Sequence, residues 1–377
     1  MKILHIAETI WGGCGTYLNE IVPLQIDRLG AHNLRCIVPT QHLAHLSDIP
    51  EELVDGFDRP SRKTGLLRLA SATRAAVRDW QPDVIHAHST FAGAVVRAMS
   101  CFQAMPPIVY CAHGWVFDVA RRPVARRMTE AAERMLSHRA RRIVAISQAE
   151  RLSGERAGIS ADKLVVVANG IGAQVPTQRA EWNDERIKLL FVGRLDRQKG
   201  VDVLLKAVTG LEDHIALRIV GEQVVSGAPS LAAANTLPHV EFLGWQDKQG
   251  VAAQLNACDA VVMPSRWEGF GLVAVEAMRA GKPVIASAIG GLPEIVLNDV
   301  TGYLVQPDNA HALAAALSTL NRDRLERMGQ AGHARFLECF TSKRTNDGLM
   351  QVYAEALHGS ARAGAYAKPQ EAGRIGG

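Results

Sequence analysis

The stretch from Pro264 to Glu294, PSRWEGFGLVAVEAMRAGKPVIASAIGGLPE, decides the fold of this chain. It follows a short run, residues 259–263, that is apolar and β-branched and therefore predicts a buried parallel strand. Gly269 and Gly271 stand where an apolar pattern with a period of 3.6 residues begins at Leu272, which predicts the start of a helix. Strand, glycine loop and helix form the repeating unit of a doubly wound α/β sheet.

The glycine loop predicts an anion site. The first N–H groups of a helix lack partners within the helix, and its peptide dipoles add about half a positive charge at that end. A phosphate binds favourably there, and glycine permits a close approach. Glu268 precedes this loop and Glu276 follows it. Because carboxylates repel phosphate, we expect them to accept hydrogen bonds from sugar or ribose hydroxyls; two solvated acids are the alternative.

The spacing of Glu268 and Glu276, with Gly-Phe-Gly between them, resembles the donor-site signature of retaining nucleotide-sugar glycosyltransferases of family 4. The blocks GKPVIA and GGLPE continue this signature, and a second block, FVGRLDRQKG at 191–200, matches the same family. The resemblance extends from residue 1 to about residue 357. It implies the GT-B fold, in which two Rossmann-like parallel-sheet domains face each other across a cleft and the last helix crosses back to the first domain.

The resemblance also implies a role for each matching residue. Arg194 and Lys199 would stabilise the negative charge on the departing diphosphate, Glu268 would contact the donor sugar and Glu276 the ribose. His113 matches a histidine near the reacting sugar, although an ordinary strand-end histidine is the alternative. The implied catalytic residues are Arg194, Lys199, Glu268 and His113, and the implied donor-binding residues are Gly13, Arg194, Lys199, Gly269, Phe270, Gly271, Leu272 and Glu276.

The alternation of predicted strands and helices divides the chain into two doubly wound domains. The expected parts are an acceptor-binding domain at 1–172, a linker at 173–186, a donor-binding domain at 187–341, a crossover helix at 342–357 and a disordered tail at 358–377. Hydrophobic residues make up 47% and charged residues 21%, which is typical of a globular enzyme. No apolar run reaches the roughly 18 residues that span a bilayer, so we expect a cytoplasmic protein with six reduced cysteines.

The first glycine-rich turn, Trp11-Gly-Gly-Cys-Gly15, also follows a strand and enters a helix. It does not fit dinucleotide binding, because Leu18 stands where a third glycine or alanine is needed and the second strand ends without a ribose-binding acid. The resemblance instead implies that Gly13 approaches the donor across the cleft. Family members more often carry a hydrophobic residue and an acid after the paired glycines, so Cys14-Gly15 departs from that pattern.

A zinc site is a second interpretation of the first domain. His86 and His88 lie two positions apart on one predicted strand, and Cys111 and His113 do so on the next, so each pair shares a face. No acid stands ready as a hydrolytic base in either motif. Two further rivals to sugar transfer are a nucleotide-sugar epimerase and a phosphorylase with pyridoxal phosphate on a lysine. A noncatalytic binding module would not need both cations and both carboxylates together.

Basic residues concentrate in the first half. Residues 1–175 hold 21 basic and 16 acidic groups, and residues 120–142 alone hold eight arginines against two glutamates. Pro123 suits the first turn of a helix, in which Val124, Met128, Ala131 and Met135 form a stripe that we expect to be buried. Glu130 is well placed to pair with Arg134. A solvated helix face is the simplest interpretation of the arginines from Arg121 to Arg142, and contact with an anionic membrane is the sharper one.

We therefore expect a metal-independent transferase that moves a sugar from a UDP or GDP donor to a hydroxyl acceptor with retained configuration. No Asp-x-Asp motif is present to hold a diphosphate through a metal ion. A stretch similar to ETIWGG…YLNEIVPLQ occurs in family members that build exopolysaccharide, capsule or lipopolysaccharide, so the expected acceptor is a glycan or a lipid-linked saccharide, and not nucleic acid. No cofactor besides the nucleotide sugar is implied.

Overall fold

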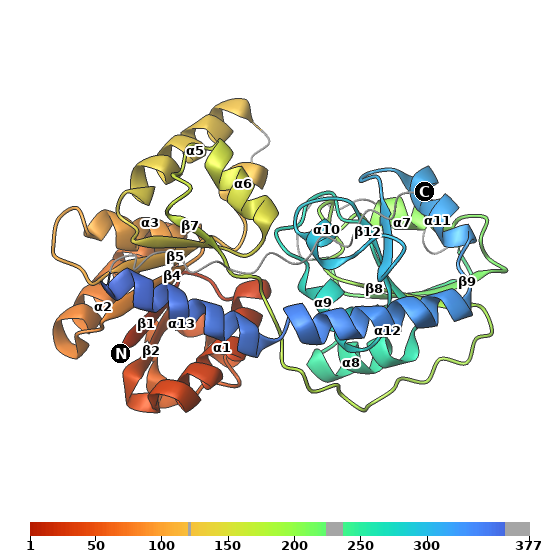
Figure 1. The fold of residues 1–377 in the computed structure, drawn as a ribbon, viewed down its shortest axis with the longest axis horizontal. Coiled ribbons are helices and arrows are strands. Elements are labelled where there is room, and N and C mark those ends of the chain that lie inside the picture. Colours follow the sequence, from red (N-terminus) through yellow and green to blue (C-terminus); the bar gives the residue numbers. More distant parts are fainter. Residues whose placement is uncertain (120–121, 224–236, 359–377) are drawn as a thin grey trace, which may run out of the picture.

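The computed structural model describes residues 1–119, 122–223 and 237–358, which form two parallel sheets with helices against them (Figure 1). The first sheet has seven strands in the order β3-β2-β1-β4-β5-β6-β7. These strands are β1 Ile3–Ala7, β2 Leu34–Pro39, β3 Val54–Phe57, β4 Val84–His88, β5 Ile108–Cys111, β6 Arg142–Ala145 and β7 Leu164–Val166. Its helices are α1 Gly13–Leu29, α2 Arg62–Trp80, α3 Thr90–Met99, α4 Val116–Val119, α5 Pro123–Ser137 and α6 Gln148–Arg156, with short 3-10 turns at Ala31–Asn33, Thr40–His45 and Glu51–Leu53.

The second sheet has six parallel strands in the order β10-β9-β8-β11-β12-β13. These strands are β8 Ile187–Val192, β9 Ile215–Val220, β10 Val240–Gly244, β11 Ala260–Met263, β12 Val284–Ser287 and β13 Gly302–Val305. The helices of this half are α7 Val201–Val208, α8 Lys248–Ala257, α9 Leu272–Arg279, α10 Leu292–Ile295, α11 Ala310–Ser318 and α12 Arg322–Cys339. The predicted fold class, two Rossmann-like domains, is confirmed.

Strand order places the functional loops. The central strands β1, β4 and β5 are buried at every position, as expected where helices cover both faces of a parallel sheet. In each sheet the order reverses beside the first strand, between β1 and β4 and between β8 and β11. Ligands of such sheets bind beyond the carboxyl ends of the strands at this reversal. The glycine loops after β1, β8 and β11 all begin there.

The last helix, α13 (Ser342–His358), returns to the first domain as predicted. It packs against α1, β4 and β5, and its Tyr353 hydroxyl lies 2.7 Å from Nδ1 of His86. Figure 1 shows α12 and α13 end to end across both halves of the molecule. The predicted linker lies between β7 and β8. The disordered tail predicted at 358–377 begins one residue too early, because His358 still belongs to α13, and residues 359–377 fall outside the described residues. No described helix is long and apolar enough to cross a membrane.

The predicted burial of the α5 stripe is wrong. Val124, Met128, Ala131 and Met135 all face outward, and the buried side of α5 instead carries Glu133. The physical reason is a buried ion pair: Glu133, on the inward side of α5, pairs with the buried Arg97 of α3. The predicted pair of Glu130 with Arg134 is also wrong, because Glu130 pairs with Arg126.

Candidate active site

Two loops of the second domain, one between β8 and α7 and one between β11 and α9, are joined by hydrogen bonds. The Gln198 side-chain amide donates to the Trp267 carbonyl oxygen (3.2 Å), and the Gln198 carbonyl oxygen accepts from the Arg266 N–H (2.8 Å). Gly200, with φ of +69°, packs so tightly on the Pro264 carbonyl that no Cβ fits there. The motifs at 191–200 and 264–271 therefore form one rigid platform.

The two predicted cations lie on this platform. Lys199 Nζ is 2.6 Å from Oε2 of Glu268, and the two side chains are only 17% and 12% exposed. The Arg194 guanidinium donates to the Asp196 carboxylate and to the Gln198 amide oxygen, both at 2.8 Å. Three of the four residues predicted to be catalytic are thus brought together, with Arg194 and Lys199 held in defined orientations.

The helix α9 begins at this platform. Its N-cap is Gly271 with φ of +110°, and no side chain caps the helix, so its positive end is available to an anion. Phe270 is buried with its ring 6.0 Å from that of Phe340, so only its backbone is available to a ligand. Leu272 lies across the domain boundary from Gly13: a Cβ on Gly13 would be 3.8 Å from its Cδ1. The two predicted glycine loops therefore meet.

The first domain touches the Gly269 loop directly. A Cβ on Gly269 would lie 3.6 Å from the Gly114 Cα, and the Ser147 hydroxyl donates to the Gly269 carbonyl oxygen (3.1 Å). The Glu294 carboxylate accepts hydrogen bonds from the first two backbone N–H groups of α6, each at 2.7 Å. A negative charge at a helix N-terminus is stabilising, so Glu294 holds the two domains together beside the glycine loop.

His113 follows β5 in a left-handed conformation with φ of +55°, and it ends a chain of buried histidines. Its Nε2 lies 3.0 Å from Nδ1 of His88, and Nε2 of His88 lies 3.0 Å from Nδ1 of His5. His5 Nε2 is 2.8 Å from the Gln25 amide oxygen. Because an amide oxygen only accepts, His5 carries its proton on Nε2, His88 on Nε2 and His113 on Nε2.

These histidines are neutral at pH 7. Burial lowers the pKa of His113 and of His5 to about 4. Burial, reinforced by His86 and its neighbours, lowers the pKa of His88 well below its ordinary value. Neutral rings serve here as hydrogen-bond donors and acceptors, and they carry no positive charge toward a diphosphate.

Glu276, on α9, is partly buried where the second domain faces the first. Burial raises its pKa to about 7; Arg279 opposes this rise, and Glu20 of the first domain adds to it. None of the described residues donates a hydrogen bond to its carboxylate, and the guanidinium of Arg279 on the same helix donates to the Gly172 carbonyl oxygen instead. An acceptor that is partly buried and without a donor suits a ligand hydroxyl.

Two family models match the chain, and together they cover both sheets. One is described as glycosyltransferase family 4 and matches residues 11–174; the other is described as glycosyl transferases group 1 and matches residues 176–335. The chain belongs to this glycosyltransferase family. The GT-B fold is shared with solved structures, among them the Anabaena protein HepE in complex with UDP-glucose, with a TM-score of 0.77 at 24% identity over 94% of this chain and all of that one.

Relatives of this glycosyltransferase include a Klebsiella pneumoniae protein described as an uncharacterised 41.2 kDa protein in the cps region. It is 31% identical over 85% of this chain and 90% of its own length. A D-inositol 3-phosphate glycosyltransferase of Actinosynnema mirum is 33% identical over 73% of this chain and 72% of its own length.

The sequence interpretation gave no role to two residues at this site of the glycosyltransferase, Glu150 and Glu294. Glu150 on α6 accepts hydrogen bonds from the N–H groups of Gly114 and Ile146, both at 2.6 Å, and burial raises its pKa to about 7. Ser147 and Glu150 have the spacing of a helix capping box, and this pattern could have identified Glu150 from the sequence. The signal for Glu294 was its place in the GGLPE block.

The zinc interpretation named the wrong set of residues. Among the described residues, the group whose ligand atoms lie within 4.8 Å of one another is His5, His86 and His88, without Cys111 or His113. His5 and His88 share a hydrogen bond, and Nδ1 of His86 bonds to Tyr353. These contacts account for the cluster as part of the packed core between β1, β4 and α13.

Proposed function

We propose that this glycosyltransferase moves a sugar from a nucleotide diphosphate donor to a hydroxyl of a glycan or lipid-linked acceptor, with retention of configuration. The observation that carries this proposal is the platform on which Arg194, Lys199 and Glu268 converge at the N-terminus of α9. Cations and free N–H groups suit a diphosphate, and a carboxylate beside them suits a sugar hydroxyl. The UDP-glucose complex of HepE supports a nucleotide-sugar donor.

The same platform supplies the chemistry of transfer. When the bond between the sugar C1 and the phosphate oxygen breaks, its electron pair leaves with the diphosphate and the ring becomes oxocarbenium-like. Arg194, Lys199 and the start of α9 stabilise the charge that grows on the leaving oxygen. The acceptor oxygen bonds to C1 on the same face, and its proton passes to the departing phosphate oxygen. Glu268 orients the sugar, and Glu276 accepts hydrogen bonds from the ribose.

We propose further that transfer needs no metal ion, because the side chains at the platform already supply positive charge to the diphosphate. Activity is therefore expected to survive excess EDTA. Loss of activity that added Mg²⁺ or Mn²⁺ restores would contradict this part, and restoration by Zn²⁺ alone would return attention to the His5, His86 and His88 cluster.

A capsule-region relative favours a role on the cytoplasmic side of cell-surface polysaccharide assembly. The deciding experiment is a thermal-shift screen of UDP, GDP and ADP sugars, because a ligand at 100 times its dissociation constant adds about 2.7 kcal/mol of stability. The stabilising donor is then incubated with and without acceptor saccharides, and the anomeric configuration of the product is read by NMR. Isomerised sugar from donor alone would favour an epimerase, and binding of no nucleotide sugar would reject the proposal.

A further inference from the structure

The helix α5 presents its apolar side to solvent. Val124 is 70% exposed, and Met128 and Met135 are each 67% exposed. Together with the exposed Ala131 they are spaced by four, three and four residues, which places them in one line along the helix. We call this line the α5 stripe. An apolar helix stripe normally faces the core, so this orientation needs a cause.

The cause is a buried ion pair on the side of α5 that faces the protein. The Glu133 carboxylate, on the side of α5 opposite the stripe, is 2.9 Å from the guanidinium of Arg97, and both side chains are buried. The Tyr110 hydroxyl donates to Glu133 (3.2 Å), and the Arg97 guanidinium lies 3.8 Å from the centre of the Tyr110 ring. Turning the stripe inward would leave Arg97 buried without its partner, which is strongly unfavourable. The buried ion pair therefore fixes the stripe outward.

Positive charge flanks the stripe. Arg126 is paired with Glu130, but Arg122, Arg127 and Arg134 form no ion pair with any residue that the structure describes. Arg127 and Arg134 follow the same side of the stripe at a spacing of seven residues. The predicted basic segment also includes Arg121, which lies outside the described residues. An apolar line with arginines beside it is the pattern of a helix that lies in the interface of an anionic bilayer.

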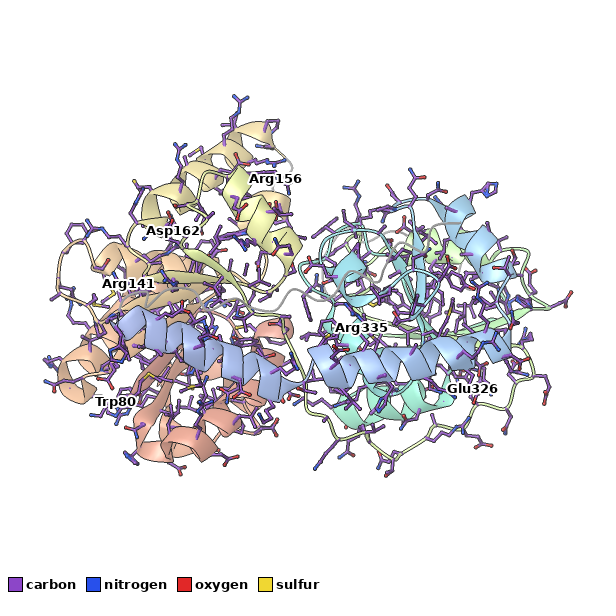
Figure 2. All side chains as sticks on the ribbon, viewed as in Figure 1. Trp80, Arg141, Arg156, Asp162, Glu326 and Arg335 are labelled. Carbon is purple, nitrogen blue, oxygen red and sulfur yellow. The ribbon has the colours of Figure 1, made fainter. Side chains whose placement is uncertain are left out.

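We propose that α5 docks this protein on an anionic lipid surface, with the α5 stripe in the acyl–headgroup boundary and Arg127 and Arg134 on the headgroups. The lipid surface would be a partner of the proposed function. Docking itself does not depend on that function, but the suggestion that the acceptor is linked to this lipid does. The helices α5 and α6 stand together on one side of the first sheet, and Arg156 at the end of α6 lies beside them (Figure 2). The Glu294 carboxylate caps the N-terminus of α6, so the helix beside α5 in Figure 1 begins at the interdomain boundary.

Vesicle sedimentation tests the proposal with the full chain. Wild type is expected to sediment with phosphatidylglycerol-rich vesicles and much less with pure phosphatidylcholine, and 1 M salt should weaken the difference because it screens charges beyond about 3 Å. Substituting Val124, Met128 and Met135 by serine is expected to weaken binding on the order of 100-fold or more. Substituting Arg127 and Arg134 by glutamine is expected to weaken it roughly 20-fold at low salt, about fivefold per charge.

The matched control removes three other exposed apolar side chains, Leu67→Ser on α2, Val300→Ser in the turn before β13 and Leu337→Ser on α12. This variant should sediment as wild type does. Equal sedimentation of the stripe variant and the control overturns the proposal. Sedimentation velocity without lipid tests the alternative that a second copy of the protein covers the stripe. A wild-type dimer that dissociates when the stripe is changed to serine would make the stripe a subunit interface. Neither readout depends on sugar transfer, so failure of the proposed function is distinguishable from failure of docking.

Discussion

Lys199 and Glu268 form an ion pair of 2.6 Å although they lie 69 residues apart on two loops of the second domain. The pair joins the residue predicted to bind phosphate to the residue predicted to bind sugar. Under the proposed function, the diphosphate would share Lys199 with Glu268, and the sugar would approach Glu268 from the side that Lys199 leaves open.

Replacing Lys199 by alanine, or Arg194 by alanine, is expected to lower kcat on the order of 100-fold or more, because each stabilises charge that develops mainly in the transition state. Steady-state kinetics with the stabilising donor measure this effect. Lys206→Ala is the matched control, since Lys206 is exposed on α7 and outside the platform. Wild-type turnover of Lys199→Ala would reject the catalytic assignment.

Glu276→Ala is expected to weaken binding of the free nucleotide by about 1.5–3 kcal/mol, the value of a hydrogen bond to a charged acceptor. Since the pKa of Glu276 is raised to about 7, more of the acid is ionised at pH 8 than at pH 6, so the difference should grow with pH. Calorimetric titration at both pH values measures it. Glu326→Ala, an exposed residue on α12 outside the platform (Figure 2), should change nothing, and an equal affinity of Glu276→Ala and wild type would exclude the ribose role.

The sequence predicts the strands and glycine loops well because each is a local pattern. The platform is an example: the strand before Pro264, the glycines at 269 and 271 and the helix from Leu272 all lie where the apolar period changes. The edge strand β3 is not predicted, because Val54-Asp-Gly-Phe57 has two exposed residues in its centre and no clear alternation.

The orientation of α5 shows what a local pattern cannot predict. The spacing of Val124, Met128 and Met135 defines the stripe, but the side that faces the core depends on Arg97, a residue on a different helix. Burial of one charge thus outweighs burial of three apolar side chains. The partners of Glu150 and Glu294 are likewise distant backbone groups, which no spacing along the chain reveals.

Glu150→Gln is expected to change how stability depends on pH. Burial raises the folded pKa of Glu150 to about 7 from an ordinary value of 4.5, so the folded protein keeps a proton that the unfolded chain releases. This stabilisation is full below pH 4.5 and is lost as pH rises through 7. From pH 5.5 to 8 the wild type should therefore lose about 2 kcal/mol relative to Glu150→Gln. Urea unfolding followed by tryptophan fluorescence measures the difference, and parallel pH profiles would contradict the assigned shift.

The last prediction concerns the chain of hydrogen bonds from Gln25 through His5 and His88 to His113. Because the Gln25 amide oxygen accepts from His5, each ring along the chain is held with its proton on Nε2. Nδ1 of His113 therefore keeps a free lone pair. His5→Phe should remove this constraint without touching His113, so that His113 becomes a mixture of tautomers.

Long-range ¹H–¹⁵N NMR of the imidazole nitrogens reads the tautomer directly, and kcat is expected to fall about tenfold, the value of one buried hydrogen bond. His86→Phe is the matched control: His86 is equally buried on β4 beside His88, but it bonds through Nδ1 to Tyr353 and to none of the three rings from His5 to His113. A general loss of packing would affect both variants alike. Only His5→Phe should change the His113 nitrogen shifts, and an unchanged Nε2–H signal for His113 in that variant would show that the chain does not control the tautomer.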